Sequence, residues 1–430
     1  MLFNKVDKIK LKKVHALINE IFQKPKQEFI FGESPITTGL AIYSGAEINS
    51  VIDSLLSGRL GLANSGRTFE KKFADYTNRD KCILVNSGSS ANLLALDAIK
   101  VKYNLNGGEI ITPACSFPTT VNPIIQLGFT PAFVDVDESL NISPKGILRA
   151  INSKTKGLLF SHTLGNPSDM GEIMSIAKRN KLFVIEDCCD AYGSKYNGKM
   201  CGSFGISSTY SFYPAHTITL GEGGAITTNN SELFKIIRSL RDWGRDCWCD
   251  TGVSNTCGRR FGYMLDGVNY DHKYIYSTIG YNMKPLELQA AMGLEQLKKL
   301  NYFCEIRKRN FNILTKEFQK FTKYFELPKI HPKAEPVFFG FPILIKDKRI
   351  DRTELVKFLN KKKIATRYLF GGNLTCQPAY KNIDYKVYQK LEYTDKIMRY
   401  LFWIGIHPGI NEEIITYVVD SFSTYLGNKR

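Results

Sequence analysis

The sequence has no stretch of about twenty consecutive apolar residues, so it contains no candidate for a helix that spans a bilayer. Its N-terminal segment is basic but lacks a long apolar core and a small-residue cleavage site, which is typical of an amphipathic helix rather than a signal peptide. Internal repeats and low-complexity linkers are also missing. These absences exclude a membrane span and a repeat architecture, and they predict a cytoplasmic protein with no membrane partner.

The composition is that of a folded protein, with 43% hydrophobic and 23% charged residues. The chain has 430 residues, and single cores stop growing at roughly 250–300 residues, so we expect two domains. With 58 basic and 41 acidic residues the net charge is +17, and residues 298–363 alone hold 18 basic and 7 acidic residues. Such a charge raises the possibility of a nucleic-acid partner. No binding motif or basic–aromatic stripe supports that partner, so we expect none.

Short apolar runs alternate with helical stretches from about residue 80 onward. This rhythm predicts an α/β fold with a mostly parallel sheet covered on both faces. The expected strands are 82–86, 109–112, 132–136, 157–162 and 182–187. A long helical stretch over 285–321 leads into a smaller α+β unit. We therefore predict an N-terminal arm (1–45), a large domain (46–304) and a small C-terminal domain (305–430).

Two motifs stand where such sheets bind ligands. NSGSSAN (86–92) follows a strand and opens a helix, so its backbone N–H groups and the helix dipole favour an anion. In VIEDCCDA (184–191), Asp187 ends a buried strand, and α/β sheets bind ligands at the carboxyl ends of their strands. A carboxylate there can pair with a protonated pyridine nitrogen. Each motif alone is equally typical of an ordinary turn or cap.

The segment STYSFYPAHTITLGEGGAITT (208–228) adds a strand, a polar turn and a glycine-rich hairpin. Together the three segments resemble the fold-type I pyridoxal phosphate enzymes, within them the DegT/DnrJ/EryC/StrS family of nucleotide-sugar aminotransferases and dehydratases, over about residues 40–430. The family's shared active sites imply a homodimer. The resemblance implies cofactor contacts from Gly88, Ser89, Ser90 and Ser211 at the phosphate, Phe117 on the ring, Asp187 at the ring nitrogen, Asp190 near the ring hydroxyl, and Asn282 at the neighbouring subunit's phosphate.

The lysine that aminotransferases use is missing. The resemblance places the catalytic position at His216, and no lysine occurs between Lys199 and Lys235. Histidine cannot bond covalently to the cofactor aldehyde, but it is a competent base near neutral pH. Pyridoxamine phosphate held without a covalent link would support dehydration of a keto sugar rather than transamination. Within the family, this substitution resembles the keto-deoxy-sugar 3-dehydratases, with His216 as the catalytic base.

Ten cysteines without an export signal point to metal or catalysis rather than disulfides. Cys189, Cys247, Cys249 and Cys257 form the pattern C-x57-C-x-C-x7-C. Four thiolates suffice for a two-iron two-sulfur cluster or a structural zinc, and spacing alone leaves both open, together with buried free thiols and a choice between Cys188 and Cys189. The pattern resembles that of the iron–sulfur dehydratases of CDP-4-keto-6-deoxyglucose, which implies a 2Fe–2S cluster.

This resemblance implies removal of the 3-hydroxyl of CDP-4-keto-6-deoxyglucose, on the way to 3,6-dideoxyhexoses of bacterial lipopolysaccharide. Its implied partners are the CDP-sugar, a second copy of the chain, and a flavin- and iron–sulfur-containing reductase that uses NADH or NADPH. Three alternatives stay open: a cluster-free dehydratase of GDP-4-keto-6-deoxymannose, an ordinary nucleotide-sugar aminotransferase, and a zinc-stapled scaffold without activity.

Overall fold

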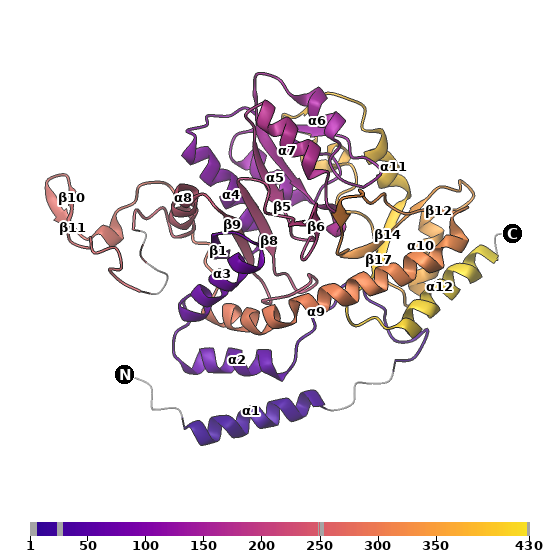
Figure 1. Ribbon diagram of the computed structural model, residues 1–430, viewed down its shortest axis with the longest axis horizontal. Helices are drawn as coiled ribbons and strands as arrows, with labels where there is room; N and C mark the ends of the chain where they lie inside the picture. The colour runs from indigo at the N-terminus through magenta and orange to yellow at the C-terminus, as the bar shows by residue number, and fades with distance from the viewer. Residues whose placement is uncertain (1–6, 24–28, 248, 250–252, 428–430) are drawn as a thin grey trace.

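An eight-stranded sheet forms the centre of the molecule in the computed structural model, which describes residues 7–23, 29–247, 249 and 253–427 (Figure 1). All neighbouring strands from β8 to β16 run parallel, and β9 runs antiparallel to both β1 and β8. This mixed, mostly parallel sheet confirms the predicted α/β fold. In spatial order the strands are β1 (Lys81–Val85), β9 (Gly224–Thr228), β8 (Ser207–Ser211), β5 (Phe183–Asp187), β4 (Thr155–Ser161), β2 (Glu109–Pro113), β3 (Thr130–Val134) and β16 (Lys386–Val387).

Helices cover both faces of this sheet because the buried strands are apolar on both sides. On β4, Leu159 packs in one hydrophobic cluster while Leu158 and Phe160 pack in another, as the alternation of side chains along a strand requires. The first cluster lies under α4 (Gly88–Lys102), α5 (Pro118–Gln126) and α8 (Ser231–Arg241). The opposite face is covered by α3 (Asn64–Tyr76), α6 (Pro144–Ala150) and α7 (Met170–Arg179).

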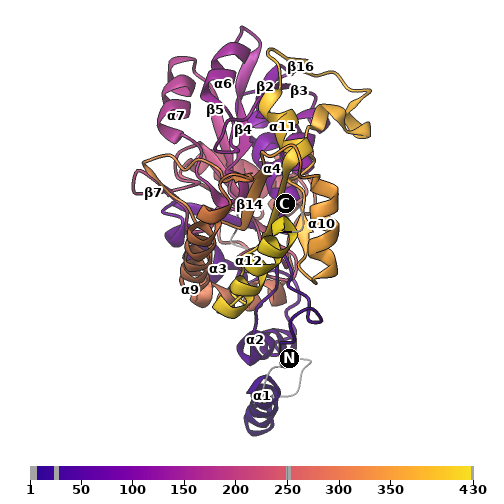
Figure 2. The same ribbon diagram turned by 90° about the vertical axis from the view of Figure 1, so that its right-hand side faces the viewer.

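The C-terminal part forms a second, antiparallel sheet, reached through the continuous helix α9 (Glu287–Phe318) (Figure 2). The predicted boundary at residues 304/305 falls inside α9, and β16 from the C-terminal part pairs with β3 of the large sheet. The division into an arm and two domains therefore stays a prediction. The second sheet comprises β12 (Phe325–Glu326), β14 (Gly340–Ile345), β17 (Leu401–Gly405) and β15 (Thr366–Arg367), with α10 (Arg352–Lys361), α11 (Glu392–Tyr400) and α12 (Glu412–Gly427) around it.

A lobe of residues 245–279 leaves the large sheet after α8 (Figure 1). It carries the hairpin of β10 (Tyr263–Leu265) and β11 (Val268–Tyr270), whose residues are all exposed, followed by the short helix η2 (His272–Tyr274). Figure 1 shows this lobe at the edge of the molecule, well apart from β5. This lobe is a candidate contact surface, because several of its large apolar side chains are exposed.

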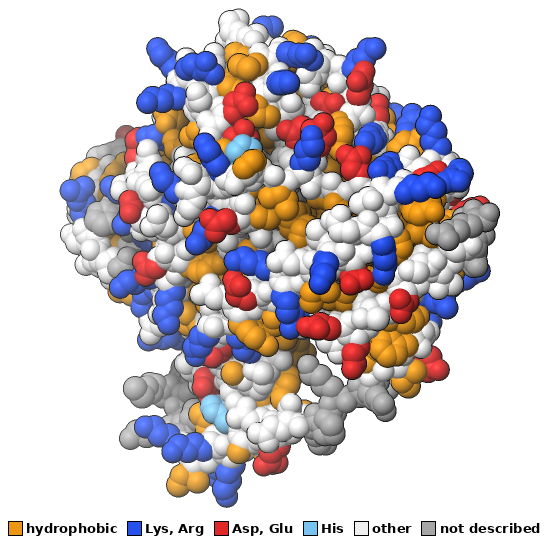
Figure 3. Space-filling view, turned by 45° about the vertical axis from the view of Figure 1, so that its right-hand side comes forward, with side chains coloured by type: hydrophobic (Ala, Val, Ile, Leu, Met, Phe, Trp, Pro, Cys, Tyr) orange, Lys and Arg blue, Asp and Glu red, His pale blue; other side chains and the backbone are white. Residues whose placement is uncertain are grey.

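The N-terminal arm contains α1 (Lys8–Gln23), which buries no residue and lies against α2 (Gly45–Leu56) through the pair of His15 and Asp53. Among the described residues, no helix is both long and apolar enough to cross a bilayer. Lys and Arg side chains are scattered among acidic ones over the face shown in Figure 3. On that face the positive charge forms no continuous stripe.

Candidate active site and metal centre

Asp187 is fixed at the carboxyl end of β5 by three donors. Its Oδ2 accepts hydrogen bonds from Asn92 Nδ2 (2.9 Å) and Thr120 Oγ1 (2.7 Å), and its Oδ1 accepts one from the Cys189 backbone N–H (3.1 Å). Thr209 Oγ1 in turn donates to Asn92 Oδ1 at 2.6 Å, which fixes the amide orientation. The carboxylate is almost completely buried. It is therefore a preorganised anion, suited to a cationic ring nitrogen.

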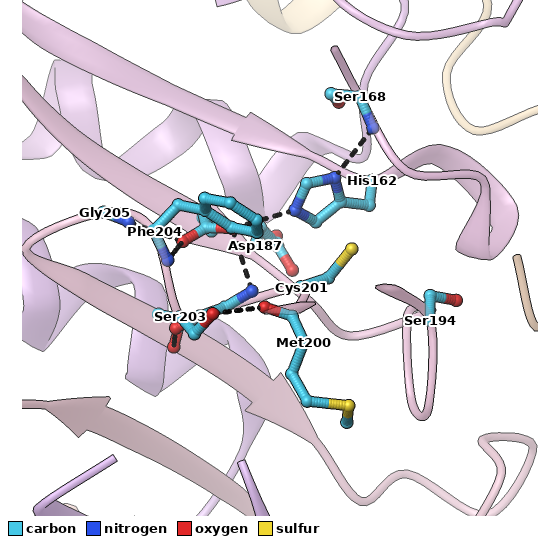
Figure 4. Close-up of polar contacts among 12 residues, drawn as sticks. His162, Ser168, Asp187, Ser194, Met200, Cys201, Ser203, Phe204 and Gly205 are labelled. Carbon is cyan, nitrogen blue, oxygen red and sulfur yellow. Dashed lines mark hydrogen bonds and ion pairs between the residues drawn. The ribbon is translucent and has the colours of Figure 1, made fainter. Parts of the chain in front are cut away.

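A second buried hydrogen-bond network, centred on His162 and Glu186, supports the end of β5 (Figure 4). The Ser168 backbone N–H donates to His162 Nδ1 at 3.1 Å, so His162 carries its proton on Nε2 and donates to Glu186 Oε2 at 3.1 Å. The Glu186 carboxylate also accepts three backbone N–H bonds, from Gly202, Phe204 and Gly205. These hydrogen bonds rigidify the surroundings of Glu186, including the residues that precede Asp187.

The predicted phosphate residues meet where α4 begins. Ser87 is the N-cap of α4 and accepts from the Ser90 backbone N–H at 3.1 Å. Gly88 packs so closely on β8 that a Cβ at this position would lie 2.5 Å from Ser211 Cβ. The helix N-terminus and Ser211 thus form one small cradle, where backbone N–H groups and the helix dipole favour an anion.

The other predicted cofactor residues border this cradle. Ser89 Oγ donates to Thr119 Oγ1 at 3.0 Å, and Phe117 leads into α5 with 52% of its surface exposed. Asn282 is exposed and forms a β-bridge with Asp242. The backbone N–H of Asn86 donates to the carbonyl of Met283, which follows Asn282, so this segment lies beside the phosphate loop.

His216 lies in the turn after β8, with Nδ1 3.6 Å from Asp190 Oδ1. That Nδ1 is buried and has no hydrogen-bond partner among the described residues. Burial, reinforced by the Arg307 charge, lowers the pKa of His216 to about 3, whereas burial and the charge of Asp187 raise the pKa of Asp190 to about 7. At neutral pH the imidazole is therefore uncharged, as a proton acceptor must be. The His216–Asp190 pair was not predicted from the sequence.

This donor set fits a phosphate-bearing pyridine cofactor. The cradle at Gly88 and Ser211 suits the phosphate, Asp187 suits the ring nitrogen, and the unpartnered Nδ1 of His216 is available for proton transfer. Sequence analysis missed Asn92 and Thr120, the two side chains that orient Asp187. The sequence signal for Asn92 is its place in the NSGSSAN motif, and that for Thr120 is its place in the helix that follows the strand over 109–112.

Three predicted metal ligands come together in the lobe. Cys249 Sγ lies 3.4 Å from Cys257 Sγ, and the donor atoms of Cys247, Cys257 and His272 all lie within 4.8 Å of one another. Burial opposes ionisation of Cys249, but hydrogen bonds from the Cys257 backbone and from neighbouring thiols outweigh it and lower its pKa to about 6. Burial and the neighbouring Cys249 raise the pKa of Cys247 to about 11, so the case for a metal site rests on the distances between the donor atoms. His272 was not predicted from the sequence as a member of this group.

The group lines a cavity of about 710 Å³. Among the described residues, the charged lining of this cavity is mostly basic, with one acidic residue, Asp242, against Arg59, Arg245, Arg260, Lys273 and Lys284. A cluster bound by thiolates carries net negative charge, so this basic lining suits it.

Cys189 lies elsewhere, beside Asp187 and Asp190. In the part of the chain that the structure describes, no hydrogen bond joins Cys189 to the lobe cysteines. Cys188 is enclosed with His162 and Glu186 in the buried network. One chain thus assembles three of the four predicted thiols, and the role of Cys189 stays a prediction.

Comparison with known proteins identifies the same family that the motifs resemble. The model of the DegT/DnrJ/EryC1/StrS aminotransferase family matches residues 42–423. The lipopolysaccharide biosynthesis protein RfbH of Salmonella typhimurium is 46% identical, with 93% of each chain covered. The dTDP-4-dehydro-2,6-dideoxy-D-glucose 3-dehydratase of Saccharopolyspora spinosa is 43% identical, over 93% of this chain and 88% of the relative.

A solved structure shares the architecture. The GDP-4-keto-6-deoxy-D-mannose 3-dehydratase of E. coli, determined with bound hydrated PLP, superposes with a TM-score of 0.81 at 29% identity. The alignment covers 90% of this chain and 98% of that chain. With this coverage, most of the fold that carries the site described above is shared with a protein solved with bound PLP.

Proposed function

This chain belongs to the DegT/DnrJ/EryC1/StrS aminotransferase family, and we propose that it is a pyridoxamine-phosphate-dependent 3-dehydratase of a nucleotide-linked 4-keto-6-deoxy sugar. One observation carries the proposal: an uncharged, unpartnered His216 stands at the turn where an aminotransferase needs a lysine. Bound pyridoxamine phosphate supplies an amine for the keto group and an electron sink that lets the 3-hydroxyl leave. Relatives named as sugar 3-dehydratases support this reaction class.

Each predicted residue has a separate task in this reaction. Asp187 pairs with the protonated ring nitrogen, and the N-terminus of α4 with Ser211 binds the phosphate, which orients the ring. His216 takes the proton from C4′ of the cofactor with its neutral imidazole. Asp190, 3.6 Å away, stabilises the imidazolium that forms. Phe117 covers one face of the ring.

The finer proposal is CDP-4-keto-6-deoxyglucose as substrate and a 2Fe–2S cluster at Cys189, Cys247, Cys249 and Cys257. The grouping of three of these thiols in a basic cavity supports a metal centre. The product of dehydration needs two electrons to become a deoxy sugar, and a cluster transfers electrons singly. A reductase that uses NADH or NADPH would supply them, and a second copy of the chain would bring Asn282 to the phosphate.

A cluster-free GDP-sugar dehydratase is the second candidate. It is favoured by the 33% identity, over 86% of this chain, to the GDP-4-keto-6-deoxy-D-mannose 3-dehydratase of Yersinia pseudotuberculosis. This candidate predicts no iron and gives the lobe cysteines no function.

The test uses full-length protein purified without oxygen. Iron and sulfide are quantified, the absorbance is recorded before and after dithionite, and CDP-, dTDP- and GDP-linked 4-keto-6-deoxy sugars are each offered with pyridoxamine phosphate. Loss of the 3-hydroxyl from the CDP-sugar with about two irons per chain supports the full proposal. Transfer of an amino group to the sugar contradicts the dehydratase. Zinc, or no metal, contradicts the cluster alone.

A further inference from the structure

Arg307 of α9 is a buried cation without a carboxylate in ion-pair contact. Only 1% of its surface is exposed, and in the part of the chain that the structure describes no ion pair joins it to Asp or Glu. Its Nε also has no hydrogen-bond partner among the described residues. A buried charge is costly unless a partner replaces the lost hydration, so packing alone does not account for an arginine at this position.

The guanidinium of Arg307 holds Phe339. Its Nη1 donates to the Phe339 carbonyl oxygen at 2.7 Å, and its Cζ lies 5.2 Å from the centroid of the Phe339 ring, close enough for a cation–π attraction. The Phe339 backbone N–H donates to the Leu164 carbonyl at 2.8 Å, and Trp403 packs against the ring with 5.6 Å between centroids. These contacts fix both the backbone and the ring of Phe339.

The same Phe339 ring contacts His216. The two ring centroids lie 5.3 Å apart, with 47° between the ring planes. Because Nδ1 of His216 has no hydrogen-bond partner among the described residues, that nitrogen does not fix the rotation of the imidazole. Tyr213, a second aromatic neighbour, is half-exposed and lies farther away, at 6.3 Å. The buried Phe339 ring is therefore the firmer support of the imidazole plane.

We propose that Arg307 is a positioning residue of His216: its guanidinium holds the Phe339 ring, and that ring holds the imidazole in the orientation that proton transfer requires. The inference rests on the proposed function, because it takes His216 as the base. Arg307 acts through Phe339 and not by direct contact with the reacting atoms.

The physical reason is the short range of proton transfer. A base must come within hydrogen-bond distance of the proton that it removes, and a displacement of about 1 Å can lower the rate about 10²-fold. An imidazole that rotates freely would spend most of its time outside this geometry. Burial together with the Arg307 charge also lowers the pKa of His216 to about 3, so the same arginine favours the uncharged form of the base.

The first measurement needs neither cofactor nor sugar. Full-length protein is treated with diethyl pyrocarbonate, which acylates uncharged imidazoles, and mass spectrometry of the peptides follows each histidine separately. Arg307→Met removes the cation, and Phe339→Leu removes the ring. We expect His216 to react several-fold faster in both variants than in the wild type, because its imidazole is released. His331, which pairs with Asp169, is the internal reference and should react at an unchanged rate.

The second measurement compares turnover with binding. In Arg307→Met and Phe339→Leu, kcat for dehydration should fall by up to about 10²-fold, while KM for the sugar and the Kd of pyridoxamine phosphate stay near those of the wild type. Arg307→Lys keeps a cation near the ring, so it should recover part of kcat. Arg309→Met is the matched control, because Arg309 is exposed on the same helix and bonds only to the neighbouring Asn310 among the described residues.

Two results would overturn the inference. Unchanged His216 reactivity and kcat in folded Arg307→Met and Phe339→Leu would remove the support, and either variant carries the test if the other does not fold. Loss of pyridoxamine phosphate binding in parallel with kcat would make Arg307 a part of the general scaffold. A wild type without dehydratase activity would contradict the proposed function, whereas the acylation rates of His216 would still show whether Arg307 and Phe339 hold its ring.

Discussion

His216 Nδ1 and Asp190 Oδ1 lie 3.6 Å apart, and neither side chain has more than 15% of its surface exposed. The pair combines an imidazole whose pKa falls to about 3 with a carboxyl whose pKa rises to about 7. Two groups with pKa values moved apart by their environment are the usual components of proton transfer.

Replacing His216 by Asn should lower dehydration about 10²–10⁴-fold, the usual contribution of a general base. Cofactor binding should stay close to that of the wild type, because Asp187 and the α4 cradle are untouched. Sugar turnover and equilibrium binding of pyridoxamine phosphate check the two parts of this prediction. Turnover retained by folded His216→Asn would remove His216 from its proposed role.

Asp190 should make the stability of the cofactor-free protein depend on pH. Its pKa of about 7 in the folded state exceeds the usual pKa of an aspartate, 3.8. The folded state therefore binds more protons between about pH 4 and 7, and this stabilisation is present at low pH and lost as the pH rises. Asp190→Asn should become more stable relative to the wild type across this interval. Urea unfolding at several pH values measures the difference, and a constant difference would contradict the prediction.

Gly88→Ala should damage the phosphate cradle. The added Cβ would lie 2.5 Å from Ser211 Cβ, so the start of α4 or the end of β8 must move. Overpacking of this kind costs about 1–3 kcal/mol of unfolding free energy, and it should also weaken the binding of inorganic phosphate and of pyridoxamine phosphate. Gly427→Ala is the control, because nothing lies within 4 Å of its Cβ position.

Cys257→Ser should remove the metal centre, because the Cys257 sulfur lies between two other candidate ligand atoms. It is 3.4 Å from Cys249 Sγ and 4.0 Å from His272 Nδ1. We expect iron and sulfide to be lost and reduction of the sugar to stop, while pyridoxamine phosphate still binds. Cys376→Ser is the matched control, since Cys376 is exposed in the C-terminal part. Equal iron contents in the two variants would contradict the assignment.

Ile279 should lie in an interface between two copies of the chain. It is 94% exposed, and the same lobe exposes Phe261, Met264 and Val268 by 60–65%. Clustered exposed apolar side chains mark interaction surfaces. Light scattering should show a dimer for the wild type and a shift toward monomer for Ile279→Glu. Leu148→Glu, on the exposed side of α6, is the control, and a monomeric wild type would contradict the prediction.

The sequence by itself determined the parts of this protein that depend on local geometry. Apolar runs of strand length predicted the parallel strands, because a buried strand excludes polar residues on both faces. The resemblance to the family implied the positions of Ser211 and His216 relative to Asp187, and the structure places β5 beside β8 in a parallel pair. A missing lysine is likewise a property of the sequence alone.

The tertiary structure decided which distant residues meet. Asn92 and Thr120 orient Asp187 from α4 and α5, and Asp246 and His272 join across 26 positions of an irregular lobe. No periodicity marks such contacts, since they depend on how separate elements pack. The same reason explains Cys189, whose spacing fits a four-cysteine motif although its backbone N–H bonds to Asp187 at the end of β5. Figure 1 shows β5 apart from the hairpin of β10 and β11 in the lobe.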